Sequence, residues 1–255
     1  MKEIVTDLQA EREALDQFLM TLADEMWDLP TPAEGWTVRD SVSHIAQIDD
    51  TAISLLRGDN SPLKEASQTG RDANGVGPGR GRAIRPRELL SWLHRSGATM
   101  FDELLECDPK RRIPWFALPM GARSFATARL METWAHGLDC FAAVGVEPVD
   151  TDRLRHTARL AHMARPYAHE VNGLQTPTKP LRLELRLPSG TPWVHGPEDA
   201  VDTVSGDAGD FCRVAVRRRH WKDSQLTVKG DEAKQFVEIV QTYAGPPGSG
   251  RISQR

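Results

Sequence analysis

The sequence predicts an α+β fold, in which helices fill the first two-thirds of the chain and a small mixed domain follows. Apolar residues recur at helical spacing as far as about residue 172. From Leu181 to Leu187, Leu alternates with charged residues without a break, which predicts a half-buried strand. Pro177 and Pro180 separate the two patterns. We therefore expect a helical bundle over residues 1–172, a small α+β domain over residues 178–245 and a loose tail over residues 246–255.

The first two helices carry clear start and stop signals. An apolar stripe predicts a first helix that continues until Pro30, Thr31 and Pro32 end it. Thr37 and Asp40 have the spacing of a capping box, which predicts the start of a second helix that ends before Gly58. The stripe of the first helix consists of Ile4, Leu8, Leu15, Leu19, Leu22 and Met26.

Three more helical patterns follow, over residues 85–106, 123–144 and 151–172, and Pro166 is expected to interrupt the last of them. Helices connected in this way predict an antiparallel bundle. In the small domain, a turn after residue 187 and a strand at Trp193 complete a hairpin. A helix over 208–217, a strand over 226–228 and a helix opened by Asp231 follow.

Composition excludes several classes of function. The net charge of −4 and pI of about 6.1 give no support for nucleic-acid binding. The chain has no run of about 20 apolar residues, so we expect no membrane span. The first seven residues include charged side chains and lack a long apolar run, so we expect no signal peptide. The 3 Cys are widely spaced, which favours reduced thiols and a cytoplasmic protein. We expect either a monomer or a homodimer, because the sequence does not specify the oligomeric state.

The residues that indicate chemistry lie in the fourth predicted helix. Glu132 and His136 are four apart, so their side chains share one face and can reach one metal ion. Cys140 continues that row but lies about 12 Å along the helix from Glu132, too far for the same ion. A third ligand must then come from another helix, and His44, at the edge of an apolar stripe, is the best candidate.

Two carboxylates are expected to support these ligands: Asp40, one turn before His44, and Asp139, which follows His136. Three mixed His and carboxylate ligands leave coordination positions open, as catalytic sites do. Spacing alone favours an ordinary surface pair, and the strongest apolar stripe of this helix lies largely opposite Glu132 and His136. The helix is nevertheless apolar nearly all round, as expected of a helix that is buried on both faces.

Two segments carry a resemblance to a known family: the residues from Gly35 to His44, read as GWTVRDSVSH, and those from Glu132 to Asp139, read as ETWAHGLD. Over residues 1–170 the chain resembles the DinB-like metal-binding superfamily, in particular the branch containing mycothiol-dependent maleylpyruvate isomerase. The resemblance implies a four-helix bundle in which His44, Glu132 and His136 bind zinc, with nickel as the alternative, and a mycothiol-type thiol cofactor. Weaker motifs near residues 193–197, 204–208 and 228–231 resemble an attached sterol-carrier-like domain.

From this resemblance we expect a metal-dependent enzyme that uses a low-molecular-weight thiol. Its reaction would be isomerisation of, or S-transfer to, a small electrophilic substrate. Its partners would be a small-molecule thiol and the substrate. A metal-activated hydrolase and a non-enzymatic binder of metal or small ligands stay open as alternatives. The substrate-binding residues are unknown; Arg217, Arg218, Arg219 and Arg251 are eligible to hold a carboxylate. The Gly- and Arg-rich segment 70–82 is expected to be a mobile loop, which could act as a lid.

Overall fold

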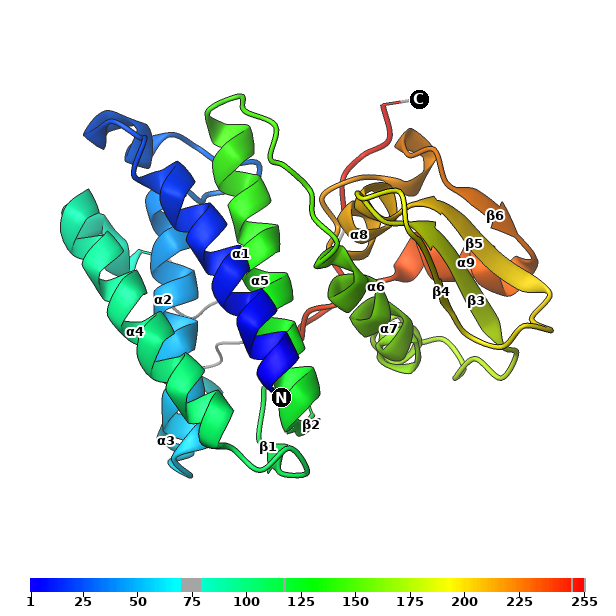
Figure 1. Ribbon diagram of the computed structural model, residues 1–255, viewed down its shortest axis with the longest axis horizontal. Helices are drawn as coiled ribbons and strands as arrows, with labels where there is room; N and C mark the ends of the chain where they lie inside the picture. Colours follow the sequence, from blue (N-terminus) through cyan, green and yellow to red (C-terminus); the bar gives the residue numbers. More distant parts are fainter. Residues whose placement is uncertain (70–78, 117, 249, 255) are drawn as a thin grey trace. The chain divides into compact units, whose positions relative to one another are not determined.

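The structure is a computed structural model that describes residues 1–69, 79–116, 118–248 and 250–254 (Figure 1). The chain divides into two compact units, Met1–Pro148 and Val149–Arg255. Each unit has its own buried apolar core. The α+β fold class predicted from the sequence is confirmed.

The first unit is a helical bundle of α1 (Lys2–Leu19), α2 (Val38–Leu56), α4 (Pro86–Glu106) and α5 (Ala122–Ala143) (Figure 1). The capping box predicted at the start of α2 is present: the Thr37 hydroxyl accepts from Asp40 N, and the Asp40 carboxylate accepts from Thr37 N. Shorter elements connect these helices: η1 (Asp24–Asp28), α3 (Ser61–Gln68), η3 (Arg80–Ala83), β1 (Arg112–Ile113) and β2 (Met120–Gly121).

Helices α2 and α4 run in the same direction. At their starts, Arg39 on α2 donates to the carbonyl of Ile84, just before α4. At their ends, Arg111, which follows α4, donates to the Leu56 carbonyl at 2.5 Å. The segment between the two helices therefore returns the chain along the length of the bundle before α4 begins.

Helices α1 and α5 also run in the same direction. Glu3 and Arg123 form an ion pair of 3.0 Å near their starts, and the rings of Phe18 and Phe141 stack near their ends. Each of these pairs lies antiparallel to the other pair (Figure 1).

Helix α1 ends earlier than the sequence predicts, at Leu19 and not at Pro30. Thr21 closes the last turn, because its amide and its hydroxyl both donate to the carbonyl of Phe18, at 2.9 and 2.7 Å. The chain then turns back into η1, where Trp27 is 1% exposed. Burial of this large ring against the bundle outweighs the helical continuation that the apolar stripe had favoured.

The second unit is built on a four-stranded sheet of order β4-β3-β5-β6. The strands β3 (Leu181–Arg186) and β4 (Pro192–His195) form the predicted antiparallel hairpin, and β6 (Thr227–Lys229) is the predicted third strand. The strand β5 (Asp202–Asp207) was not predicted; it pairs parallel to β3 and antiparallel to β6.

The helices of this unit are α6 (Leu154–Met163), α7 (Arg165–Val171), α8 (Ala208–Ala215) and α9 (Asp231–Ile239), with a short η4 (Trp221–Asp223). The predicted bundle extended to residue 172, whereas the compact units divide after Pro148. Residues 149–172 group with the second unit because α6 packs against α8. Pro166 lies in the first turn of α7, so the interruption predicted near it is present.

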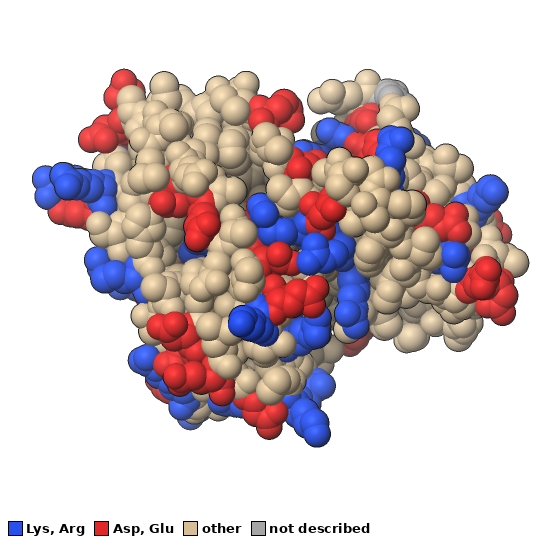
Figure 2. All heavy atoms as spheres, viewed as in Figure 1, with Lys and Arg blue, Asp and Glu red and all other residues tan. Residues whose placement is uncertain are grey.

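In the described residues, no helix is both long enough and apolar enough to span a membrane. On the face shown in Figure 2, acidic and basic side chains are interspersed, without a wide field of one sign. Cys140 and Cys212 are buried and Cys107 is half-buried, all three as free thiols. Burial raises the pKa of Cys140 and Cys212, so both thiols are protonated core residues.

Candidate metal centre

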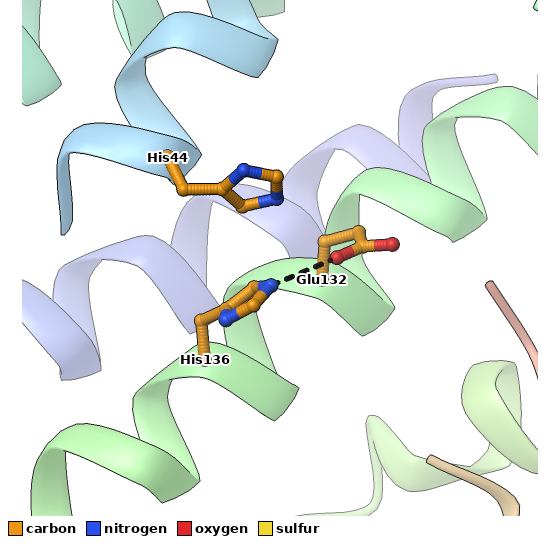
Figure 3. Close-up of side chains that lie close together, drawn as sticks. All are labelled: His44, Glu132 and His136. Carbon is orange, nitrogen blue, oxygen red and sulfur yellow. Dashed lines mark ion pairs between the residues drawn. The ribbon is translucent and has the colours of Figure 1, made fainter. Parts of the chain in front are cut away.

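Two of the predicted ligands come from one face of α5. Glu132 and His136 stand one turn apart, and His136 Nε2 lies 3.2 Å from Glu132 Oε2 (Figure 3). His136 is 6% exposed and the Glu132 side chain is 16% exposed, so the pair is no ordinary surface pair. Helix α5 is buried nearly all round, which explains why its apolar stripe did not locate the site.

The third predicted ligand faces this pair from α2. The imidazole of His44 is 2% exposed and lies edge-on to that of His136, with ring centroids 4.7 Å apart (Figure 3). One ligand atom from each of His44, Glu132 and His136 can be chosen so that all three lie within 4.8 Å of one another. Two helices far apart in sequence thus bring two nitrogens and one carboxylate oxygen to a common point.

Trp36 covers the two imidazoles. Its ring stacks on His136 at 5.4 Å with an interplanar angle of 8°, and its centroid lies 5.2 Å from that of His44. Trp36 precedes the capping box, and an isolated bridge between Pro30 and Thr37 closes the loop that carries it. The start of α2 therefore positions both a ligand and an apolar wall beside it.

The charge state of Glu132 suits a metal ligand. Burial by itself raises the pKa of Glu132, but the hydrogen bond from His136 and the nearby charges of His136, Arg129 and His44 outweigh it, and the pKa is lowered to about 2. Glu132 is therefore a carboxylate at neutral pH and needs no deprotonation to bind a cation.

The two predicted supporting carboxylates occupy different positions. Asp139 is 1% exposed, and its Oδ2 lies 3.8 Å from His136 Nδ1, on the side of the ring away from Glu132. Asp40 caps α2 and also accepts hydrogen bonds from Gly79 N at 2.6 Å and from the Arg82 side chain at 2.9 Å. The role predicted for Asp40, orienting His44, stays a prediction, and so does the supporting role of Asp139.

The described end of the Gly- and Arg-rich segment is anchored beside the site. Residues 70–78, most of the segment expected to be a mobile lid, lie outside the described residues. Gly81 packs so closely on α2 that a Cβ atom there would lie 2.6 Å from the Cβ of Ser43. A glycine is thus required where this segment crosses the helix one residue before His44.

A buried polar cluster near the candidate ligands connects helices α1, α2 and α5. The Arg12 side chain on α1 pairs with Asp49 on α2 at 2.8 Å and donates to Thr133 on α5 at 3.2 Å. Arg12 and Asp49 are both almost fully buried. The cluster joins the elements that carry His44 and Glu132, because Asp49 follows His44 on α2 and Thr133 follows Glu132 on α5.

The arginines that the sequence made eligible for substrate binding belong to the second unit. Arg217 donates to the carbonyls of Glu238 and Gly248, at 2.8 and 2.7 Å, and Arg218 donates to the Val216 carbonyl at 2.9 Å. Arg219 forms an ion pair with Asp210. These contacts hold their guanidinium groups against the backbone and a carboxylate of that unit.

Two residues near the ligands had no predicted role. Trp36 belongs to the segment GWTVRDSVSH, but its position before the capping box does not by itself indicate contact with His44, which lies nearly two turns into α2. Arg129 is buried one turn before Glu132. The signal for it was an arginine in the middle of a helix that is apolar nearly all round.

Comparisons with known proteins show which family the chain resembles. The family model described as "Mycothiol maleylpyruvate isomerase N-terminal domain" matches residues 8–141. Two proteins of Mycobacterium tuberculosis, from strains CDC 1551 / Oshkosh and ATCC 25618 / H37Rv and both named only as uncharacterized, are 40% identical over 252 residues, which is 97% of this chain and 97% of each relative.

Solved structures show the same fold. The crystal structure of the mycothiol-dependent maleylpyruvate isomerase matches with a TM-score of 0.59 at 18% identity, over 94% of this chain and 96% of that one. A mutant of that enzyme matches with a TM-score of 0.57 at 19% identity, over the same shares of the two chains. At this level of identity the likeness concerns the fold alone.

Proposed function

Because the chain belongs to the mycothiol maleylpyruvate isomerase N-terminal domain family, we propose that it is a metal-dependent enzyme that uses a low-molecular-weight thiol. The resemblance noted in the sequence to the isomerase branch is confirmed by that family model. The sterol-carrier-like nature of the second unit stays a prediction.

The observation that carries the proposal is the convergence of His44, Glu132 and His136: one ligand atom from each lies within 4.8 Å of the other two, with both histidines buried and Glu132 partly buried. Imidazole nitrogens and a carboxylate oxygen are donors that zinc binds at about 2 Å, and tetrahedral zinc would keep a fourth position open. Zinc is therefore the first choice and nickel the second. These residues would hold the ion through His44 from α2 and through Glu132 and His136 from α5.

When bound, the ion would lower the pKa of a thiol at its open position, and the resulting thiolate would supply the nucleophile that adds to an electrophilic carbon. The chain's own residues prepare that position. Glu132 is already ionised, so it offers a charged oxygen without releasing a proton. Trp36 covers the two imidazoles and limits the access of water to them.

We propose isomerisation or S-transfer on a small electrophilic substrate, with a mycothiol-type thiol as the cofactor. In isomerisation the thiol would be regenerated when the double bond re-forms. In S-transfer it would remain in the product, in place of a leaving group. Both reactions need a reduced thiol pool, so we place the protein in the cytoplasm.

The test is anaerobic incubation of zinc-loaded protein with mycothiol and maleylpyruvate, compared with the His136→Ala variant and with wild type lacking thiol. We expect product only when metal, thiol and His136 are all present. Equal product formation by wild type and His136→Ala would overturn the proposal. Hydrolysis of a test ester that needs metal but no thiol would favour the hydrolase alternative. Full metal loading without any turnover would favour a binding protein.

A further inference from the structure

A buried arginine that has no ion-pair partner among the described residues lies beside the candidate ligands. Arg129, on α5 one turn before Glu132, is 3% exposed. Within the described part of the chain it forms no ion pair, and its Nε atom has no hydrogen-bond partner. Burying a guanidinium costs several kcal/mol unless other charges compensate for it. Packing alone therefore does not explain why a charged residue occupies this buried position.

Aromatic rings hold the guanidinium in place. Its carbon lies 4.4 Å from the ring centroid of Trp115 and 5.7 Å from that of Phe125. Trp115 follows β1 and is 8% exposed, so it closes this part of the bundle. Cation–π contacts of this kind contribute about 2 kcal/mol or more when desolvated, which fixes the charge without neutralising it.

The two carboxylates near Arg129 already have other partners: Asp49 pairs with Arg12, and Glu132 pairs with His136. The negative charges that act on it are those of Glu132 and Asp49. Asp49 is paired with Arg12 at 2.8 Å, so its charge is largely compensated. Glu132 is therefore the principal counter-charge for Arg129. A divalent ion on Glu132 would offset that negative charge and leave the positive charge of Arg129 without compensation.

We propose that Arg129 selects anionic ligands for the metal centre. The open position of the metal-loaded site would then bind a thiolate or a carboxylate in preference to a neutral molecule. Arg129 acts through space in a medium of low dielectric constant and is a specificity-determining residue that need not touch the ligand. The inference rests on the proposed function, because it assumes that Glu132 binds a cation.

The experiment uses the full chain loaded with cobalt(II), whose visible absorption changes when a ligand enters its coordination sphere. Acetate serves as the anionic probe and imidazole as the neutral one. We expect Arg129→Met to weaken acetate binding about tenfold, which corresponds to about 1.4 kcal/mol. It should weaken imidazole binding by less than about threefold, and Arg129→Lys should retain most of the acetate affinity.

The matched control is Arg123→Met, which removes a positive charge from an exposed position on the same helix. Solvent screens that charge, so neither affinity should change by more than about twofold. If circular dichroism shows that Arg129→Met does not fold, Arg129→Gln takes its place with the same expected result.

The outcomes separate this inference from the function on which it rests. Cobalt uptake with unchanged acetate affinity in the Arg129 variant would overturn the inference and leave the proposed function standing. Equal weakening of acetate and imidazole would also overturn it, because a purely structural arginine would affect both probes alike. Failure of the wild type to bind cobalt would overturn the metal centre itself.

Discussion

The indole of Trp36 lies flat on the imidazole of His136, with ring centroids 5.4 Å apart and the two planes 8° from parallel. The same indole contacts His44, the candidate ligand from the other helix. Trp36 thus contacts both imidazoles, although it lies in a loop and is far in sequence from His136.

This stacking predicts a fluorescence signal for metal binding. Cobalt(II) or nickel(II), both paramagnetic, should quench Trp36, whereas zinc should quench it little. Because the chain has 7 Trp, we expect a partial loss of emission in wild type and at least a twofold smaller loss in Trp36→Phe. Titration of the apoprotein, followed by tryptophan emission, checks this. Equal quenching of both proteins would mean that the ion binds elsewhere.

Removal of the third ligand should abolish tight binding without unfolding the bundle. We expect His44→Ala to lower zinc affinity by at least about 100-fold, since it removes one of three protein donors. The melting temperature of the metal-free protein should change little. Elemental analysis after gel filtration measures the metal. Stoichiometric zinc in the variant would contradict the assignment of His44.

The buried pair of Arg12 and Asp49 should contribute strongly when only one partner is removed. We expect Arg12→Leu to lower the free energy of unfolding by about 3–5 kcal/mol, because it leaves a buried carboxylate without its cation. Urea denaturation gives the value. The matched control is Glu103→Gln, which breaks the more exposed ion pair with Arg57 and should cost less than about 1 kcal/mol. Similar losses in the two variants would refute the special role of the buried pair.

Asp40 should make the bundle sensitive to acid. Burial raises the pKa of Asp40, but hydrogen bonds from Arg82, Thr37 and Gly79 outweigh it, so the pKa is lowered below the ordinary value of 3.8. Unfolded Asp40 binds its proton more readily than folded Asp40 does. Its contribution to stability is therefore fully present above pH 3.8 and is lost as the pH falls through the folded pKa.

We accordingly expect Asp40→Asn to lower stability at pH 7 by about 1–2 kcal/mol and to flatten the fall of stability below pH 4. Arg82→Met should remove only part of this acid dependence, because the amides of Thr37 and Gly79 still donate to Asp40. Urea unfolding between pH 3 and pH 7 measures both. A wild-type acid profile that Asp40→Asn leaves unchanged would contradict the argument.

The close approach at Gly81 predicts a packing defect on substitution. A Cβ atom there would meet Ser43 at 2.6 Å, so we expect Gly81→Ala to cost about 1–3 kcal/mol. Gly121→Ala is the control, since its φ of −61° suits any residue and no atom lies within 4 Å of the added Cβ. Gly121 is the N-cap of α5, where alanine is less favourable than glycine, so the control should cost less than about 1 kcal/mol in thermal unfolding. Equal losses of stability in the two variants would show that the segment around Gly81 does not pack tightly against α2.

Much of the fold follows from local patterns. The capping box of Thr37 and Asp40, the strand from Leu181 and the break near Pro166 were predictable, because each depends on neighbouring residues. The end of α1 was not, because burial of Trp27 against distant helices decided it. The strand β5 was missed because Asp202 to Asp207 lacks an apolar alternation, although it becomes an inner strand of the sheet.

The sequence by itself determined the pairing of Glu132 with His136, because helical geometry places residues four apart on one face. It also made His44 the best candidate for a third ligand, and its motifs carried the resemblance that the family model confirms. Only the tertiary structure decided that the imidazole of His44 lies 4.7 Å from that of His136, that Trp36 covers both, and that Arg129 is buried without an ion pair among the described residues. These relationships join elements far apart in the chain, and the packing of helices, which no local pattern specifies, sets them.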